Sequence, residues 1–146
     1  MRAQEAAALI DVDNLALGGR RRPEELNLVL DQIMALTRDM PVTAAMNRQV
    51  AERYLPCLGP RGWRTLITDS TPNAADLVLL EAGRDHAACG RQSLLVASGD
   101  HTFAGLSVVA YLHVLSFEDQ LSRKLRLAAT GLMLLDNLIT ARPTAA

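Results

Sequence analysis

The chain has 146 residues, of which 49% are hydrophobic and 21% charged, and this suits one compact domain with a substantial core. Its formal net charge of -1 excludes recruitment of nucleic acid or an acidic membrane by bulk electrostatics, so any polyanion must be bound locally. The apolar segment before Asp11 is too short for a signal peptide, and no run approaches the length of a membrane span. We therefore expect a cytoplasmic protein with no membrane partner.

The first half of the chain alternates short apolar runs with helical patterns. Residues 6–12 form an apolar run that breaks after Asp11, which predicts a buried strand. Pro23 and the two glutamates after it predict a helix start, and apolar residues then recur at helical spacing as far as Arg38. We expect further strands at 41–46 and 64–68 and a helix at 49–58.

The second half begins with a helical pattern over residues 74–88 that carries Asp76 in its first turn. A second apolar run starts at Ser93, breaks at Ser98 and Gly99, and is followed directly by Asp100. The remaining expectations are a brief helix at 103–109, a strand at 111–117, a long helix at 118–139 and a flexible tail at 143–146. The last helix is apolar on more than one face, which favours either a crowded core or a homodimer through this C-terminal helix.

Strands that alternate with helices predict an α/β fold, a doubly wound parallel sheet of about five strands with helices on both faces. We expect a single domain over residues 1–142 with the strand order 3-2-1-4-5. In that order the first and fourth strands are neighbours at the point where the crevice opens, so Asp11 and Asp100 would face each other. Asp76 would open a helix on the same edge.

Carboxylates that converge without lysine partners repel one another, and a hard divalent cation normally neutralises them. Mg²⁺ or Mn²⁺ held by Asp11, Asp76 and Asp100 could orient a water for attack on a phosphodiester. Each acid also has a simpler explanation: Asp76 could serve only the helix dipole, and Asp13 could form an Asx turn with Asn14.

Three segments in order, IDVDNL at 10–15, NAADL at 73–77 and SGDHTF at 98–103, resemble the NYN domain of the PIN-like nuclease superfamily. The resemblance covers essentially the whole chain, including LSRKLRLAA at 121–129. It implies a Rossmann-like PIN fold that binds a divalent metal and cleaves RNA. Asp11, Asp76 and Asp100 match the metal-binding acids of the family, and Asn14 matches the asparagine that closes its first motif.

The sequence departs from the family pattern at two acids. Thr102 stands where a second acid usually follows the SGD motif, and Ala82 stands where the helix often carries another. Asp13 and the hydroxyls of Ser98 and Thr102 are candidates for the missing ligands. We expect weaker metal affinity than in a member with every acid, and the alternative function is a catalytically weak or inactive module that binds RNA or a protein.

Substrate contacts are expected from one basic cluster. Arg20, Arg21 and Arg22 lie in the loop after the first strand, on the edge that carries the acids, where guanidinium groups can hold phosphates. His101 is next to Asp100 and could contact substrate or metal. Aromatic residues make up only 3% of the chain, so platforms for stacking bases are scarce.

A less favoured alternative is a haloacid-dehalogenase-like phosphatase, because Asp11-Val12-Asp13 after an apolar strand also resembles its DxD nucleophile motif. That chemistry needs a lysine beside the phosphoryl group and further acids after Asp100. Lys124 is placed on the last helix, and no acid follows Asp100 before Glu118.

Overall fold

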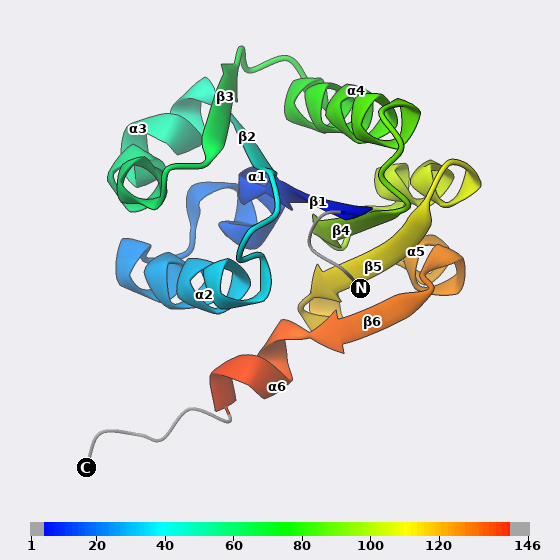
Figure 1. Cartoon of the computed structure of the whole chain (residues 1–146). Coiled ribbons are helices and arrows are strands. Elements are labelled where there is room, and N and C mark those ends of the chain that lie inside the picture. The colour runs from blue at the N-terminus through cyan, green and yellow to red at the C-terminus, as the bar shows by residue number, and fades with distance from the viewer. Residues whose placement is uncertain (1–4, 141–146) are drawn as a thin grey trace.

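The computed structural model describes residues 5–140, which form a six-stranded parallel sheet covered by helices (Figure 1). The strands are β1 (Ala6–Asp11), β2 (Val42–Asn47), β3 (Arg64–Thr68), β4 (Ser93–Ala97), β5 (Tyr111–Ser116) and β6 (Gly131–Leu134). Their order is β3-β2-β1-β4-β5-β6. The predicted α/β fold and the order of its first five strands are confirmed, and β1 and β4 are neighbours. The expected domain end at 142 and the tail at 143–146 lie outside the described residues.

Helices cover both faces of this sheet. The longer ones are α2 (Pro23–Leu36), α3 (Arg48–Leu58) and α4 (Ala74–Ala88). The short ones are α1 (Val12–Leu15), α5 (Arg123–Ala128), α6 (Leu135–Thr140) and the 3₁₀ segments η2 (Leu17–Gly19), η3 (Gly59–Arg61), η4 (His101–Val108) and η5 (Glu118–Gln120). Between residues 5 and 140 we find no helix with both the length and the apolar character that crossing a bilayer would need.

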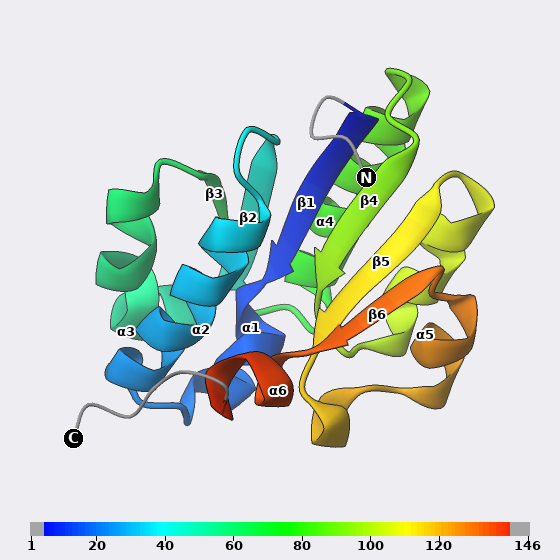
Figure 2. The ribbon, with the colours of Figure 1, turned by 60° about the horizontal axis from the view of Figure 1, so that its bottom comes forward.

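Successive side chains of the central strands point to opposite faces of the sheet, and this divides the core into two layers. Ala8 and Ile10 of β1 face a cluster built with α2 and α3, whereas Ala7 and Leu9 face a second cluster built with α4 and η4. Figure 2 shows α2 and α3 in front of the sheet and α4 behind it. α3 directly follows β2, and α2 and α4 follow β1 and β3 after short connections, so each begins at the carboxyl edge of the sheet. This edge gathers the polar residues discussed below.

The C-terminal segment differs from the single helix predicted over 118–139. It contains η5, α5, the sixth strand β6 and α6. Some of the apolar residues assigned to several faces of the predicted helix belong instead to β6. Two of them, Leu132 and Met133, are exposed. The homodimer prediction therefore loses the long helix on which it was based.

Close packing of β6 against β5 explains why residue 131 is a glycine. Gly131 pairs with His113, and a Cβ at Gly131 would lie 2.8 Å from His113 Nδ1. Thr130-Gly131 thus interrupts the helical pattern and starts an extended strand, because glycine has a low helix propensity and here leaves room for the imidazole.

Candidate functional site

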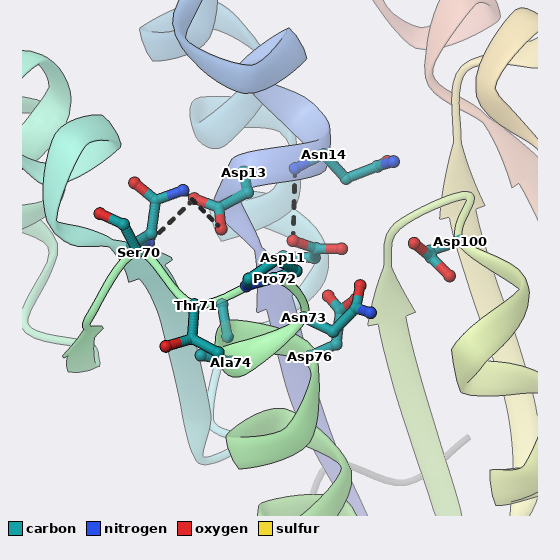
Figure 3. Close-up of a pocket in the computed structure, with 12 residues that line it drawn as sticks. Asp11, Asp13, Asn14, Ser70, Thr71, Pro72, Asn73, Ala74, Asp76 and Asp100 are labelled. Carbon is teal, nitrogen blue, oxygen red and sulfur yellow. Dashed lines mark hydrogen bonds between the residues drawn. The ribbon is translucent and has the colours of Figure 1, made fainter.

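A polar cavity of about 270 Å³ opens at the carboxyl edge of β1, β2 and β4 (Figure 3). Its walls come from α1, the end of β2, the loop between β3 and α4, and the turn after β4. It is lined by Asp11, Asp13, Asn14, Asn47, Ser70, Thr71, Pro72, Asn73, Ala74, Ala75, Asp76 and Asp100. Four of these residues are acids, and no lysine, arginine or histidine is among the described residues that line it. The structure therefore brings the predicted acids to one cavity without a cationic side chain in its lining.

Asp11 lies at the floor of this cavity with 2% of its surface exposed. It ends β1 and caps α1, because Asn14 N donates to Asp11 Oδ1 at 3.3 Å. Ser98 Oγ donates to Oδ2 at 2.7 Å, so both oxygens are held in fixed directions. Burial and, next, the charge of Asp76 raise the pKa of Asp11 to about 7 in spite of these hydrogen bonds.

Asp76 is the second buried acid, with 8% of its surface exposed. It lies in the first turn of α4, and none of the described residues donates a hydrogen bond to its carboxylate. Burial, then the charges of Asp100 and Asp13, raise the pKa of Asp76 to about 6. Figure 3 shows the carboxylates of Asp11 and Asp76 close to each other at the centre of the cavity.

Asp100 lies further to one side and has its own partners. Thr102 donates to Asp100 Oδ1 through both its backbone N at 2.8 Å and its Oγ1 at 2.6 Å, which makes Asp100 the cap of η4. His101 Nδ1 is 3.4 Å from the same oxygen, and the His101 side chain is largely exposed. The hydroxyl expected to supply a metal ligand at Thr102 therefore holds the neighbouring carboxylate.

Asp13 faces the opposite side of the cavity, where it meets Asn47. Asn47 donates to Asp13 through its backbone N at 3.0 Å and its Nδ2 at 3.4 Å. Burial raises the pKa of Asp13, and these hydrogen bonds oppose the rise. Asn47 also caps α3 by accepting from Val50 N at 2.9 Å. Sequence reasoning missed Asn47, although an asparagine just before a helix is a typical cap.

A hydrogen-bond network joins the turn after β4 to α1 and to η5. Asn14 Oδ1 accepts from Gly99 N at 3.0 Å, and Gln120 Nε2 donates to the Asn14 carbonyl at 2.7 Å. Ser122 N donates to the Gly99 carbonyl at 2.9 Å. The structure therefore gives Asn14 and Ser98 supporting places beside Asp11. Gln120 was missed because it lies 106 residues from Asn14, beyond any local pattern.

The three arginines after α1 differ in their surroundings. Arg21 is mostly covered: its Nε donates to the Leu15 carbonyl at 2.7 Å, and its guanidinium lies 4.5 Å from the centre of the Phe117 ring. Arg22 is exposed but paired with Glu25 at 2.9 Å. Arg20 is exposed, and its Nε donates to the Leu17 carbonyl at 3.0 Å. None of the three lines the acidic cavity.

The donor set of the cavity is chemically suited to a hard cation, although it is not arranged as a complete site. Across residues 5–140, no group of three or more His, Cys, Asp or Glu side chains is placed to hold a metal ion. Asp11 and Asp76 nevertheless offer two buried, mutually repelling carboxylates, and oxygen ligands of this kind suit Mg²⁺ or Mn²⁺.

Comparisons with known proteins identify the fold. No family model and no curated protein matches this chain. A protein of unknown function, VPA0982 from Vibrio parahaemolyticus, is 16% identical, with a TM-score of 0.68 over 94% of this chain and 98% of that chain. MAR1 ribonuclease from Caenorhabditis elegans is also 16% identical, with a TM-score of 0.51 over 95% of this chain and 81% of that one. The chain therefore shares a fold with a ribonuclease.

Proposed function

We propose that this protein is a metal-dependent ribonuclease of the PIN-like type, which hydrolyses RNA phosphodiester bonds in the acidic cavity. The observation that carries the proposal is the pair of buried carboxylates, Asp11 and Asp76, in a cavity whose described lining has no cationic side chain. The fold shared with MAR1 ribonuclease and the ordered resemblance to NYN domains support the same function.

Asp11, Asp76 and Asp100 are the residues that would hold Mg²⁺ or Mn²⁺. The ion would supply an oriented water and stabilisation of the charge that develops on the phosphate. Keeping two carboxylates buried side by side is unfavourable without a cation, because each disfavours the charged form of the other. Burial is the main cause of the raised pKa values, about 7 for Asp11 and about 6 for Asp76; the charge of Asp76 adds to the first, and the charges of Asp100 and Asp13 add to the second.

The surrounding residues set the directions in which these acids act. Ser98 and the backbone of Asn14 each hold one oxygen of Asp11, and Thr102 holds Oδ1 of Asp100. Asp76 is free of such donors among the described residues, so its carboxylate can turn toward a ligand. Protons held on Asp11 or Asp76 near neutral pH must leave when a cation binds, which makes binding tighter as the pH rises.

The competing function is an RNA- or protein-binding module with a degraded metal site. Two observations favour it: Thr102 donates to Asp100 where the family usually has an acid, and the described carboxylates are not grouped as a complete metal site. The phosphatase alternative gains no such support, because both oxygens of Asp13, its expected acid–base group, are bound to Asn47.

Cleavage of a mixed RNA pool with Mn²⁺ or Mg²⁺ tests the proposal, with Mn²⁺ binding measured in parallel by calorimetry. Asp76→Asn should lower kcat by at least about 100-fold, since it removes a buried charge at the reacting centre. Asp85→Asn is the matched control, because Asp85 is an exposed acid of the same helix outside the cavity. Cleavage that survives EDTA or Asp76→Asn would overturn the mechanism, and Mn²⁺ binding without cleavage would favour the binding module.

A further inference from the structure

Exposed cations flank the cavity on the side of β4 and β5. Because Ser122 N donates to the Gly99 carbonyl at 2.9 Å, α5 begins beside the turn that carries Asp100. Arg123 and Lys124 are the first two residues of α5, and both are exposed. Neither forms an ion pair with any other residue of the described chain, whereas Arg126 of the same helix is paired with Glu118 at 2.8 Å. Two exposed cations without ion-pair partners among the described residues therefore begin a helix that is anchored to the turn carrying Asp100.

A further exposed cation lies on the other side of the cavity, toward β2 and β3. Arg48 is the first residue of α3 and directly follows Asn47, which lines the cavity and holds Asp13. The hydrogen bonds from Thr71 and, more weakly, the charge of Arg48 lower the pKa of Asp69. Arg48 is thus close to the loop between β3 and α4, and within residues 5–140 it has no ion-pair partner.

The sheet order places the acids between these two groups of cations. From β2, which leads into Arg48, to β5, the order runs β2-β1-β4-β5, and three strand spacings correspond to about 14 Å. Asp11 ends β1 within this interval, and Asp76 lies beside it (Figure 3). The direct path between the two groups along this edge therefore passes over the two buried acids.

The aromatic residues leave little for bases to stack on. The chain has one tryptophan, two tyrosines and two phenylalanines, and none of them lines the cavity. Tyr54 and Phe103 are fully buried, Phe117 is 9% exposed, and Trp63 packs against the core. Tyr111 is exposed, but it starts β5 at the opposite edge of the sheet. Stacking of bases on aromatic side chains therefore contributes little at the cavity, which favours contacts to the backbone of the nucleic acid.

We propose that Arg48 on one side of the acidic cavity and Arg123 and Lys124 on the other bind phosphates of the RNA substrate, so that its strand crosses the cavity between them without regard to base sequence. This inference rests on the proposed function, because it supplies the substrate to the same acids. A single strand fits where a stiff duplex does not, since the scissile phosphate must reach carboxylates that are 2% and 8% exposed.

Binding without cleavage tests the path directly. The probe is a short fluorescein-labelled oligo(U), titrated in EDTA between roughly 50 and 200 mM salt and followed by fluorescence anisotropy. Arg123→Gln/Lys124→Gln should weaken binding roughly tenfold or more, and should flatten the slope of log affinity against log salt by about 1.4, or about 0.7 per lost phosphate contact. Arg48→Gln should flatten the slope by about 0.7.

Arg38→Gln/Arg84→Gln is the matched control. Both arginines are exposed, and they lie at or near the C-terminal ends of α2 and α4, toward the opposite edge of the sheet. The control should therefore change neither affinity nor slope. Unchanged binding in Arg123→Gln/Lys124→Gln, an equal loss in the control pair, or equally tight binding of an RNA duplex would overturn the inference. So would strong discrimination between oligo(U) and a mixed-sequence strand.

The path and the proposed function can fail separately. Oligo(U) binding with the expected salt slopes but no Mn²⁺-dependent cleavage would keep the path and reject the ribonuclease. Cleavage by the wild type, with KM unchanged in Arg123→Gln/Lys124→Gln, would keep the ribonuclease and reject the path. If both hold, this variant should raise KM and leave kcat nearly unchanged, because the removed charges bind the RNA away from the reacting phosphate.

Discussion

The two walls of the cavity carry similar acids but hold them differently. In the β1–β4 wall, formed by Asp11, Asn14, Ser98 and Gly99, hydrogen bonds link every member. In the α4 wall, formed by residues 69–76, the hydrogen bonds are local turn contacts, such as the one from Thr71 N to Asp69 Oδ1 at 2.9 Å. Among the residues that the structure describes, nothing donates to Asp76. One wall is fixed in direction, and the other can adjust.

In the proposed metal site, this difference would give the two walls different roles. A rigid carboxylate can define where a cation lies, but the remaining ligands must turn toward it. Asp76, which has no hydrogen bond to break, can make that movement at little cost. The following predictions test the fixed wall first and the adjustable wall afterwards, in order of decreasing effect.

Gly99→Ala should be the most damaging change, because the fixed wall has no space for a side chain there. A Cβ at Gly99 would overlap the Gln120 carbonyl and lie 2.7 Å from Ser116 Oγ. Separating these segments should cost about 3 kcal/mol of unfolding free energy, and it should displace Asp100 enough to abolish cleavage. Guanidinium unfolding and the RNA assay measure the two effects.

Gly105→Ala provides the comparison for that variant. Gly105 lies in η4, and a Cβ there meets no atom within 4 Å. Its unfolding free energy should stay within about 0.5 kcal/mol of the wild type. Equal stability of the two alanine variants would show that the fixed wall is not rigid.

Asp76→Asn should change how stability depends on pH. Because the pKa of Asp76 is raised to about 6 in the folded state, from 3.8, the folded protein binds more protons than the unfolded chain between these values. In EDTA the stability of the wild type should therefore fall as the pH rises from about 4 through 6, and Asp11 should extend the fall to about 7. Above that range, Asp76→Asn should be more stable than the wild type by about 1 to 2 kcal/mol.

Thermal unfolding in EDTA at several pH values measures this effect. Adding Mn²⁺ at alkaline pH should raise Tm in the wild type and much less in Asp76→Asn. A wild type whose Tm rises steadily from pH 4 to 7 would contradict the assignment of unfavourable charge to this wall.

Asn73→Gly should have the smallest effect. Asn73 precedes α4 with φ +65°, a left-handed conformation that glycine adopts without cost, and its side chain forms no cap on the helix. Stability should change by less than about 1 kcal/mol in either direction. Asn73→Val would be the contrasting variant, since a β-branched residue at this φ is strained. If Asn73→Gly alone abolished cleavage, the Asn73 amide would have to contact the substrate.

Much of the fold followed from short-range patterns. The helix at 74–88 and the strand at 64–68 have the predicted limits, because apolar periodicity and turn residues mark both ends. Asp11 at the end of β1 followed in the same way. The strand order predicted Asp11 beside Asp100, and the helix start predicted Asp76 on the same edge. That Asp76 rather than Asp100 lies closer to Asp11 did not follow from this order (Figure 3).

The rest depended on contacts that no local pattern records. Residues 118–139 are rich in leucine, which has a high helix propensity. The pairing of β6 with β5 overrides that propensity over residues 131–134. The hydrogen bonds that Thr102 donates to Asp100 and that Asn47 donates to Asp13 depend on the geometry of the turns rather than on composition. Arg21 looked like its neighbours in sequence, but packing on Phe117 sets it apart.

The bonds that complete the fixed wall also determine when it can exist during synthesis. Ser98 reaches Asp11 across 87 residues, and Gln120 reaches Asn14 across 106. Contacts this distant along the chain form late in folding and cannot form on a short nascent chain. A partly translated polypeptide that ends before Ser98 carries Asp11 and Asp76 but lacks the segment that fixes Asp11, so the acidic cavity is completed only after residue 120 has emerged from the ribosome.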